Sequence, residues 1–148
     1  MADLPKNFLE FSKLLNDHKV KYLIVGGYAV IHHGYPRSTV DFDVFVEMTR
    51  INAKRLSKAI ADFGFDPAEY SPEFFLRPSS ILMIGREPWR IDIFTTIKGL
   101  DFKTAHKSRV LLSVGGVPIP FVSKADLITS KKAANRDRDR DDLKRLGS

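Results

Sequence analysis

A short apolar run that ends at two consecutive glycines constrains the fold of this chain more than any other feature. Residues 22–25 (Tyr-Leu-Ile-Val) have the length and composition of a buried strand, and Gly26 and Gly27 follow at once. Residues 28–33 have the pattern of a short helix, which Gly34 would end. Glycines between a strand and a helix let the backbone approach a phosphate group closely. A simple tight turn would use the same glycines, so this feature alone leaves both interpretations open.

The second constraint is a pair of acidic residues, Asp41 and Asp43. From Arg37 to about Glu47 polar and apolar residues alternate, which predicts an extended segment. Asp41 and Asp43 then share one face of that segment with Arg37 and Thr39. Two neighbouring carboxylates repel each other unless a cation lies between them, and Mg²⁺ or Mn²⁺ would suit this pair. The alternative is a pair of solvated charges on an edge strand.

Asp92 is a candidate third carboxylate. It lies in residues 90–94 (Arg-Ile-Asp-Ile-Phe), where apolar neighbours predict a strand that packs against a core. Phosphoryl transfer with two metal ions or a general base needs such a third acid. Taken alone, Asp92 would be interpreted as an exposed acid on the polar face of a strand.

The remaining elements define the class of fold. We predict helices to about residue 18, at 50–63 and at 124–134, a last charged segment ending at 146, and hairpins at 81–94 and 109–122 with turns at 85–88 and 115–116. Residues 66–80 contain three prolines and give no clear prediction. The order predicts one domain over residues 1–148 of the α/β (α+β) class, with a mixed β-sheet flanked by helices and with helices at the C-terminus.

The net charge of +6 favours anionic partners such as nucleotides, RNA or phosphorylated small molecules. The chain has no cysteine, which excludes disulfides and thiolate metal sites. No apolar run approaches the roughly 18 residues of a membrane span, and no signal peptide is visible. We therefore expect a cytoplasmic protein with no membrane partner.

Three segments together resemble a known family. Residues 25–27 (Val-Gly-Gly), followed by residues 41–44 (Asp-Phe-Asp-Val), are similar to the signature of the nucleotidyltransferase (DNA polymerase β-like) superfamily. Residues 37–43 resemble the Arg-x-Thr-x-Asp-x-Asp form found in minimal AbiEii-toxin-like nucleotidyltransferases. Residues 126–143 resemble the closing motif of those families, with a lysine, small residues, an arginine and spaced acids. The resemblance implies a nucleotidyltransferase fold.

The resemblance also implies roles for individual residues. The metal-binding and catalytic residues would be Asp41, Asp43 and Asp92, and the nucleotide-binding residues would be Gly26, Gly27, Arg37, Thr39 and Lys131. The implied cofactor is Mg²⁺ or Mn²⁺. Asp139 and Asp142 match the closing acids, whose role is either structural or catalytic, and Asn135 stands where a glycine is common.

The resemblance implies Mg²⁺-dependent transfer of a nucleoside monophosphate from an NTP, such as ATP, to a hydroxyl group. The acceptor hydroxyl could belong to RNA, a protein or a small molecule. A toxin–antitoxin component would have a tRNA or protein acceptor and a cognate antitoxin as partners. The alternatives are a catalytically silent nucleotide- or RNA-binding module, and an interaction partner in a two-gene toxin–antitoxin system.

Overall fold

The computed structural model of the chain describes residues 4–35, 37–86 and 88–147. Its helices are α1 (Lys6–Asp17), α2 (Gly26–His32), α3 (Arg50–Asp62), α4 (Phe102–Lys107), α5 (Lys124–Ala134) and α6 (Asp137–Leu146), with a 3-10 helix η1 (Pro72–Leu76). Its strands are β1 (Tyr22–Val25), β2 (Asp41–Val46), β3 (Ile81–Arg86), β4 (Trp89–Phe94), β5 (Val110–Val114) and β6 (Val117–Phe121).

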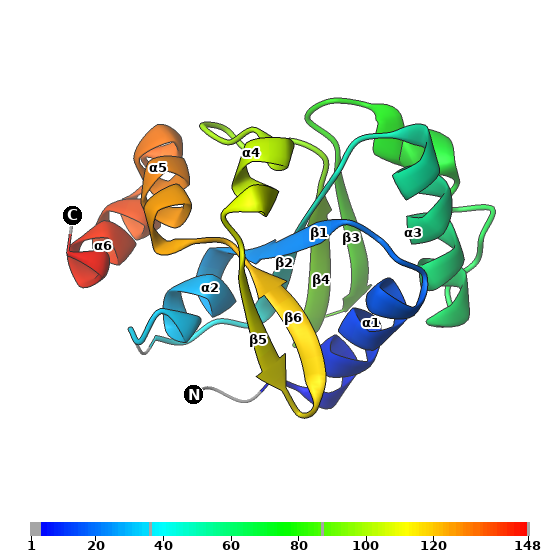
Figure 1. Cartoon of the computed structure of the whole chain (residues 1–148), viewed down its shortest axis with the longest axis horizontal. Helices are drawn as coiled ribbons and strands as arrows, with labels where there is room; N and C mark the ends of the chain where they lie inside the picture. The colour runs from blue at the N-terminus through cyan, green and yellow to red at the C-terminus, as the bar shows by residue number, and fades with distance from the viewer. Residues whose placement is uncertain (1–3, 36, 87, 148) are drawn as a thin grey trace.

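All six strands form one mixed sheet in the order β3-β4-β2-β1-β6-β5 (Figure 1). Strands β2 and β4 are parallel, as are β1 and β6, whereas the other neighbours are antiparallel. The predicted α/β (α+β) class with a mixed sheet and C-terminal helices is confirmed. The parallel pairing of β2 with β4 determines which acidic residues lie together, because it places residues 41–45 directly beside residues 90–94.

The core of the molecule lies against one face of β2. Phe42 and Val44 are fully buried on that face. The Phe8 ring of α1 stacks on Phe42 with 4.8 Å between centroids, and Tyr28 of α2 meets Phe42 edge-on at 5.8 Å. Full burial of one such side chain contributes roughly 1.5–3 kcal/mol. The packing therefore anchors β2 firmly, and it leaves the side chains of Asp41 and Asp43 for the opposite face.

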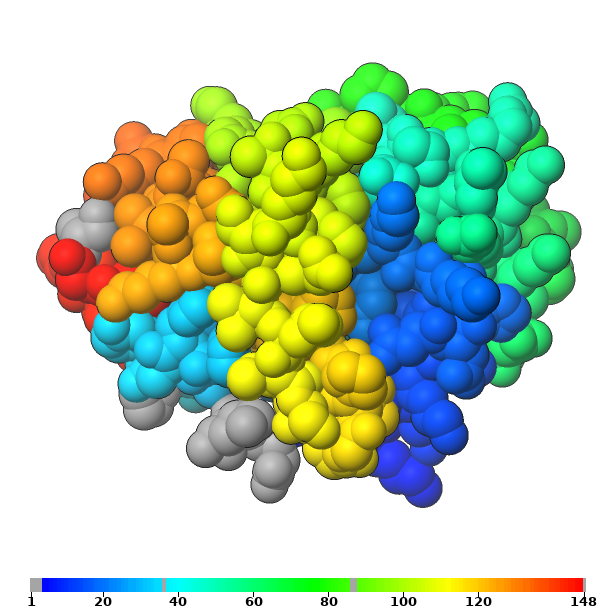
Figure 2. Space-filling model, viewed as in Figure 1, coloured from blue at the N-terminus to red at the C-terminus, as the bar shows by residue number. Residues whose placement is uncertain are grey.

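The helices at the C-terminus lie together at one end of the molecule. Figure 1 shows α5 and α6 beside α2, with α1 and α3 at the other end of the sheet. In the space-filling view of Figure 2, a band formed by α4, β5 and β6 separates the two groups of helices. No helix in the described ranges combines the length and the apolar character that a bilayer crossing requires.

The predicted elements agree with the structure except in a few places. Helix α2 begins at Gly26, two residues earlier than predicted, and the regular strand β2 begins at Asp41 rather than Arg37. Both hairpins are present; the turn predicted at 85–88 includes residue 87, which lies outside the described residues. Helix α4 was not predicted because it has only six residues, too few to show a helical period.

Candidate active site

The three predicted carboxylates come from two adjacent parallel strands. Asp43 of β2 is paired directly with Asp92 of β4, and Asp41 is paired with Arg90. Residues paired in this way project to the same face of a sheet. The sequence pattern therefore placed Asp41 and Asp43 together, and the strand register adds Asp92 to them.

Arg90 forms ion pairs with two of these acids at once. Its Nη2 donates to Asp41 Oδ2 at 2.9 Å, and its Nε donates to Asp92 Oδ1 at 2.9 Å. Nη2 also lies 3.1 Å from Asp92 Oδ2, so both oxygens of Asp92 face the guanidinium group. The other oxygen of Asp41, Oδ1, is buried and has no hydrogen-bond partner among the described residues. A positive charge thus already bridges two of the three acids.

Asp43 differs from the other two acids, because among the described residues its carboxylate takes part in no hydrogen bond or ion pair. Burial, reinforced by the negative charges of Asp92 and Asp41, raises the pKa of the Asp43 carboxyl to about 7. The positive charges of Lys131 and Arg138 reduce this rise. Asp43 is therefore the acid with the greatest need for a cation.

The glycine pair lies in close contact with the acidic segment. A Cβ atom on Gly26 would come within 2.1 Å of Asp43 Oδ2, and one on Gly27 within 2.5 Å of Thr39 Oγ1. Gly26 also has a φ of +68°, in the left-handed region that favours glycine. The absence of side chains at both glycines lets β2 and the segment before it approach the start of α2. A tight turn alone would not require this close approach.

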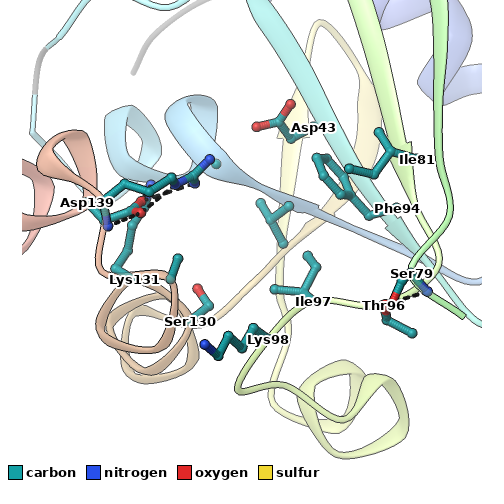
Figure 3. Close-up of a pocket in the computed structure, with 14 residues that line it drawn as sticks. Asp43, Ser79, Ile81, Phe94, Thr96, Ile97, Lys98, Ser130, Lys131 and Asp139 are labelled. Carbon is teal, nitrogen blue, oxygen red and sulfur yellow. Dashed lines mark hydrogen bonds and ion pairs between the residues drawn. The ribbon is translucent and has the colours of Figure 1, made fainter.

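Two adjoining cavities lie on the carboxylate face of the sheet. The basic cavity, of about 290 Å³, contains all eight predicted site residues: Gly26, Gly27, Arg37, Thr39, Asp41, Asp43, Asp92 and Lys131. The apolar cavity, of about 340 Å³, is lined mainly by the side chains of β3, β4 and the residues after β4, together with α5. Asp43 lines both cavities. In Figure 3, Asp43 lies between Lys131 and Asp139 on one side and Ile81 and Phe94 on the other.

Lys131 is buried and belongs to an ion network between α5 and α6. Its Nζ lies 3.2 Å from Asp139 Oδ1 and 2.9 Å from Asp142 Oδ2. Arg37 binds Asp142 from the segment before β2, with 2.9 Å between Nε and Oδ1. Arg136 binds Asp139 at 2.7 Å. The predicted nucleotide-binding role of Lys131 stays a prediction, and phosphates would have to share its ammonium group with two buried carboxylates.

The closing acids Asp139 and Asp142 take part in buried ion pairs. Asp139 and Asp142 are 0% and 1% exposed, although alternating charges on a helix usually lie in solvent. Burial alone would raise the pKa of Asp139, but hydrogen bonds from Arg136 and the charge of Lys131 outweigh it and hold that pKa below its ordinary value. Asn135 ends α5 at φ +52°, which accounts for an asparagine where a glycine is common.

Three cations of the basic cavity were missed: Arg90, Arg136 and Arg138. Arg138 takes part in no ion pair among the described residues, and it faces a cavity with three acids. The signal for Arg90 was its position two residues before Asp92, which puts both side chains on one strand face. The signal for the others was weak, since alternating charges on a helix usually lie in solvent.

The donor set suits a hard divalent ion, although it is not a ready-made metal centre. Asp41, Asp43 and Asp92 supply carboxylate oxygens, the ligands that Mg²⁺ prefers, and Asp41 Oδ1 is a buried acceptor to which no residue of the described ranges donates. Within the described ranges no three His, Cys, Asp or Glu side chains already lie close enough to hold a metal ion. The residues fit the ion by chemistry, and some rearrangement of the side chains is needed to bring their oxygens together.

Solved structures define the class of this fold. The chain is similar to a proposed nucleotidyltransferase from Thermotoga maritima, with a TM-score of 0.63, 16% identity and coverage of 93% of this chain and 88% of that one. It is similar to the lincosamide antibiotic adenylyltransferase LnuA, solved with lincomycin bound, with a TM-score of 0.58, 14% identity and coverage of 100% and 99%. A third match is an antigenic nucleotidyltransferase-like protein from Paracoccidioides brasiliensis, with a TM-score of 0.56, 14% identity and coverage of 98% and 78%. The chain therefore has a nucleotidyltransferase fold.

The sequence itself identifies the family. Residues 3–147 match the family described as "nucleotidyltransferase of unknown function (DUF6036)", and the chain belongs to this family. A comparison with curated proteins finds no significant match. The superfamily inferred from residues 25–27 and 41–44 is thus confirmed.

Proposed function

We propose that this protein transfers a nucleoside monophosphate from an NTP to a hydroxyl group in a reaction that depends on a divalent ion. One observation carries the proposal. Asp41, Asp43 and Asp92 lie together on paired strands, in the wall of a cavity that five cationic side chains also line. Carboxylates for a metal ion beside cations for phosphates are the two halves of a nucleotidyl-transfer site.

The triphosphate would lie in the basic cavity. Arg138 is the first candidate to contact it, since the described part of the chain provides no ion-pair partner for this guanidinium group. Gly26 and Gly27 allow close approach of the backbone, and Arg37 and Thr39 line the same cavity. Asp41 and Asp43 would hold Mg²⁺ or Mn²⁺, with Asp92 as the third ligand or as the base. The bound ion would offset the phosphate charge in the transition state.

The chemical step exchanges one P–O bond for another. The acceptor oxygen attacks the α-phosphorus, the bond from that phosphorus to the oxygen bridging to the β-phosphate breaks, and pyrophosphate leaves. The proton of the acceptor hydroxyl passes to a carboxylate oxygen of Asp92. Because Arg90 faces both oxygens of Asp92, this transfer requires the guanidinium group to release at least one of them.

The apolar cavity offers a place for the acceptor next to Asp43. Its volume of about 340 Å³ lies within the range of roughly 300–1,000 Å³ typical of small-molecule sites. Its walls combine Ile81, Phe94 and Ile97 with the hydroxyl groups of Ser79 and Ser130. A small molecule with an exposed hydroxyl fits this lining, and the fold shared with a lincosamide adenylyltransferase supports the same choice.

A macromolecular acceptor is the second possibility, and the net charge of +6 favours an anionic one such as tRNA. A role as a toxin with a cognate antitoxin belongs with this version of the proposal. Incubation with each labelled NTP, total RNA, cell lysate and a panel of hydroxylated small molecules would separate the acceptors, because the label would move into one fraction only.

The proposal requires metal-dependent binding of an NTP. We expect titration calorimetry to detect NTP binding in Mg²⁺ and its loss in EDTA. The double variant Asp41→Ala with Asp43→Ala should lose at least about tenfold in affinity, because the ion no longer links the phosphates to the protein. Asp17→Asn, an exposed acid at the end of α1, is the matched control and should bind like the wild type. Absence of metal-dependent binding to every NTP in the wild type would contradict the proposal.

A catalytically silent binding module is the alternative function. The observation in its favour is the bridge from Arg90 to Asp41 and Asp92, which places a protein cation where the metal ion would bind. Such a module would bind nucleotides equally well with Mg²⁺ and with EDTA, and no label would be transferred to any acceptor.

A further inference from the structure

Arg90 occupies a position that a cofactor cation would have to share. Its guanidinium group connects Asp41 on β2 with Asp92 on β4, at 2.9 Å from each. It comes from the same strand as Asp92 and is paired across the sheet with Asp41. The bridge therefore follows from the strand register and from two contacts, rather than from one loosely placed surface side chain.

We propose that Arg90 is an internal counter-ion that closes the carboxylate site in the metal-free protein and is displaced when a divalent ion binds. The inference rests on the proposed function, since it concerns the same three acids. Arg90 and the metal ion then compete for Asp41 and Asp92. The protein would keep its acids neutralised and well placed without metal, at the cost of a weaker apparent affinity for the ion.

The Arg90 bridge leaves some carboxylate oxygens of the site without a contact that a metal ion would supply. Arg90 satisfies Oδ2 of Asp41, but within the described part of the chain the buried Oδ1 has no hydrogen-bond partner. Asp43 lies beside Asp92 in register and receives no hydrogen bond from Arg90. A single ion that contacts all three acids would serve oxygens that the guanidinium group does not reach.

Arg90 also has room to move away. Its side chain is 29% exposed, compared with 24% for Asp41 and 8% for Asp92, so solvent already reaches part of the cation. The residue of β3 that is paired with Arg90 is Gly85, which has no side chain to fill the neighbouring position. A change of rotamer toward solvent would therefore free Asp41 and Asp92 without moving either strand.

The proposal predicts that removal of the bridge strengthens metal binding. We expect Arg90→Met, which keeps much of the side-chain length but not the charge, to bind Mn²⁺ about tenfold or more tightly than the wild type. Arg90→Lys keeps one charge without the planar fork that spans two carboxylates, so its affinity should be intermediate. Mn²⁺ alone is the probe, followed by calorimetry and by the electron paramagnetic resonance signal of the free ion.

Arg138→Met is the matched control for a general loss of positive charge. Arg138 lines the same basic cavity but has no ion pair with the three acids. Its removal should raise the Mn²⁺ affinity by no more than about twofold to threefold, because only the long-range repulsion of the ion is reduced. An equal gain in both variants would overturn the competition and leave only a charge effect.

Thermal unfolding provides a second measurement that does not depend on activity. In EDTA, Arg90→Met should melt below the wild type, because Asp41 and Asp92 lose their counter-ion. Addition of Mn²⁺ should then raise its melting temperature by more than it raises that of the wild type. If Arg90→Met does not fold, the same comparison is made with Arg90→Lys.

The outcomes separate this inference from the proposed function. Equal or weaker Mn²⁺ binding in Arg90→Met, with clear binding in the wild type, would overturn the displacement of Arg90 and leave the metal site standing. Binding in the variant but not in the wild type would support the competition and contradict a metal-dependent activity. Absence of binding in all variants, with or without an NTP, would remove the proposed metal site and the inference with it.

Discussion

Among individual residues, Asp43 has the acidic side chain whose pKa is most strongly affected by its surroundings. Its carboxylate is crowded by Asp41 and Asp92, and its pKa is raised to about 7 mainly by burial. A carboxyl group with a raised pKa keeps its proton in the folded protein at pH values where the unfolded chain has lost it. Between its ordinary pKa of 3.8 and about 7, the folded state binds more protons, so the stability of the metal-free protein falls as the pH rises.

Replacement of Asp43 by a neutral amide should therefore stabilise the metal-free protein, and more so at higher pH. We expect Asp43→Asn to raise the free energy of unfolding in EDTA by about 1–2 kcal/mol at pH 8, less than the full shift implies because the side chain is partly exposed. The gain should be smaller at pH 5. Urea denaturation at both pH values measures it, with Asp17→Asn as the control. A gain that does not depend on pH would contradict the raised pKa.

Gly26 is a second residue whose replacement should change stability, because of its positive φ and its proximity to Asp43. We expect Gly26→Ala to cost about 2–4 kcal/mol of unfolding free energy, because it combines an unfavourable φ with a collision against Asp43. Gly34→Ala is the matched control. It has a φ of +93° with nothing within 4 Å of its added Cβ, so it should cost only about 1 kcal/mol. Chemical denaturation measures both.

A double variant tests the contact itself. When Asp43 is also changed to alanine, the carboxylate that collides with the new methyl group is absent, so the two losses should not add. If Gly26→Ala costs as much with Asp43→Ala as without it, the close approach of these residues has no energetic effect.

At the level of helices and strands, ion pairs of the closing motif connect α6 with α5 and with the segment before β2. Lys131 joins Asp139 and Asp142, and Arg37 in the segment before β2 also pairs with Asp142. These contacts bring Arg136 and Arg138, at the start of α6, to the wall of the cavity. The motif therefore supplies the cationic side of the site even if Lys131 never touches a nucleotide.

Lys131→Met should reveal this structural role. It leaves Asp139 and Asp142 buried with only Arg136 and Arg37 as partners, which should cost about 2–4 kcal/mol at pH 7. Lys132→Met, the exposed neighbouring lysine, should cost less than about 0.5 kcal/mol. Guanidinium denaturation with both variants provides the comparison, and equal losses would contradict a structural network.

The pH dependence of that loss has a definite sign. The pKa of Asp139 is held below its ordinary value of 3.8, so its ionised form stabilises the folded state above that pH and the contribution is lost as the pH falls through the lower folded value. The difference between Lys131→Met and the wild type should thus shrink under acid conditions.

At the scale of the whole molecule, one sheet separates two kinds of surface. The face of β2 that carries Phe42 packs against α1 and α2, and the opposite face carries the carboxylates and both cavities. Three groups of residues from distant parts of the chain lie together there: the glycines after β1, the acids of β2 and β4, and the cations at the start of α6. A site of this kind needs the mixed sheet, because the parallel pairing of β2 with β4 is what aligns Asp43 with Asp92.

Features that depend on neighbours along the chain could be predicted from the amino-acid sequence. The strand at 22–25, the glycine pair, the shared face of Asp41 and Asp43 and the helix at 124–134 all follow from local pattern. The family also follows from the sequence, because its motifs are contiguous. Eight of the residues that line the basic cavity could also be named, once a family resemblance joined segments that local pattern leaves apart.

The pairing of charged side chains at the site, in contrast, depends on tertiary packing. Arg90 bridges Asp41 and Asp92 across two strands, and Lys131 and Arg37 enter one buried network with Asp139 and Asp142. Local sequence cannot reveal these pairs, because their members are up to 105 residues apart and the burial that makes the pairing necessary arises only when the elements pack. Most elements of the fold can therefore be predicted from local sequence pattern. The ion pairs around the glycines and carboxylates depend instead on which distant side chains come together when the elements pack.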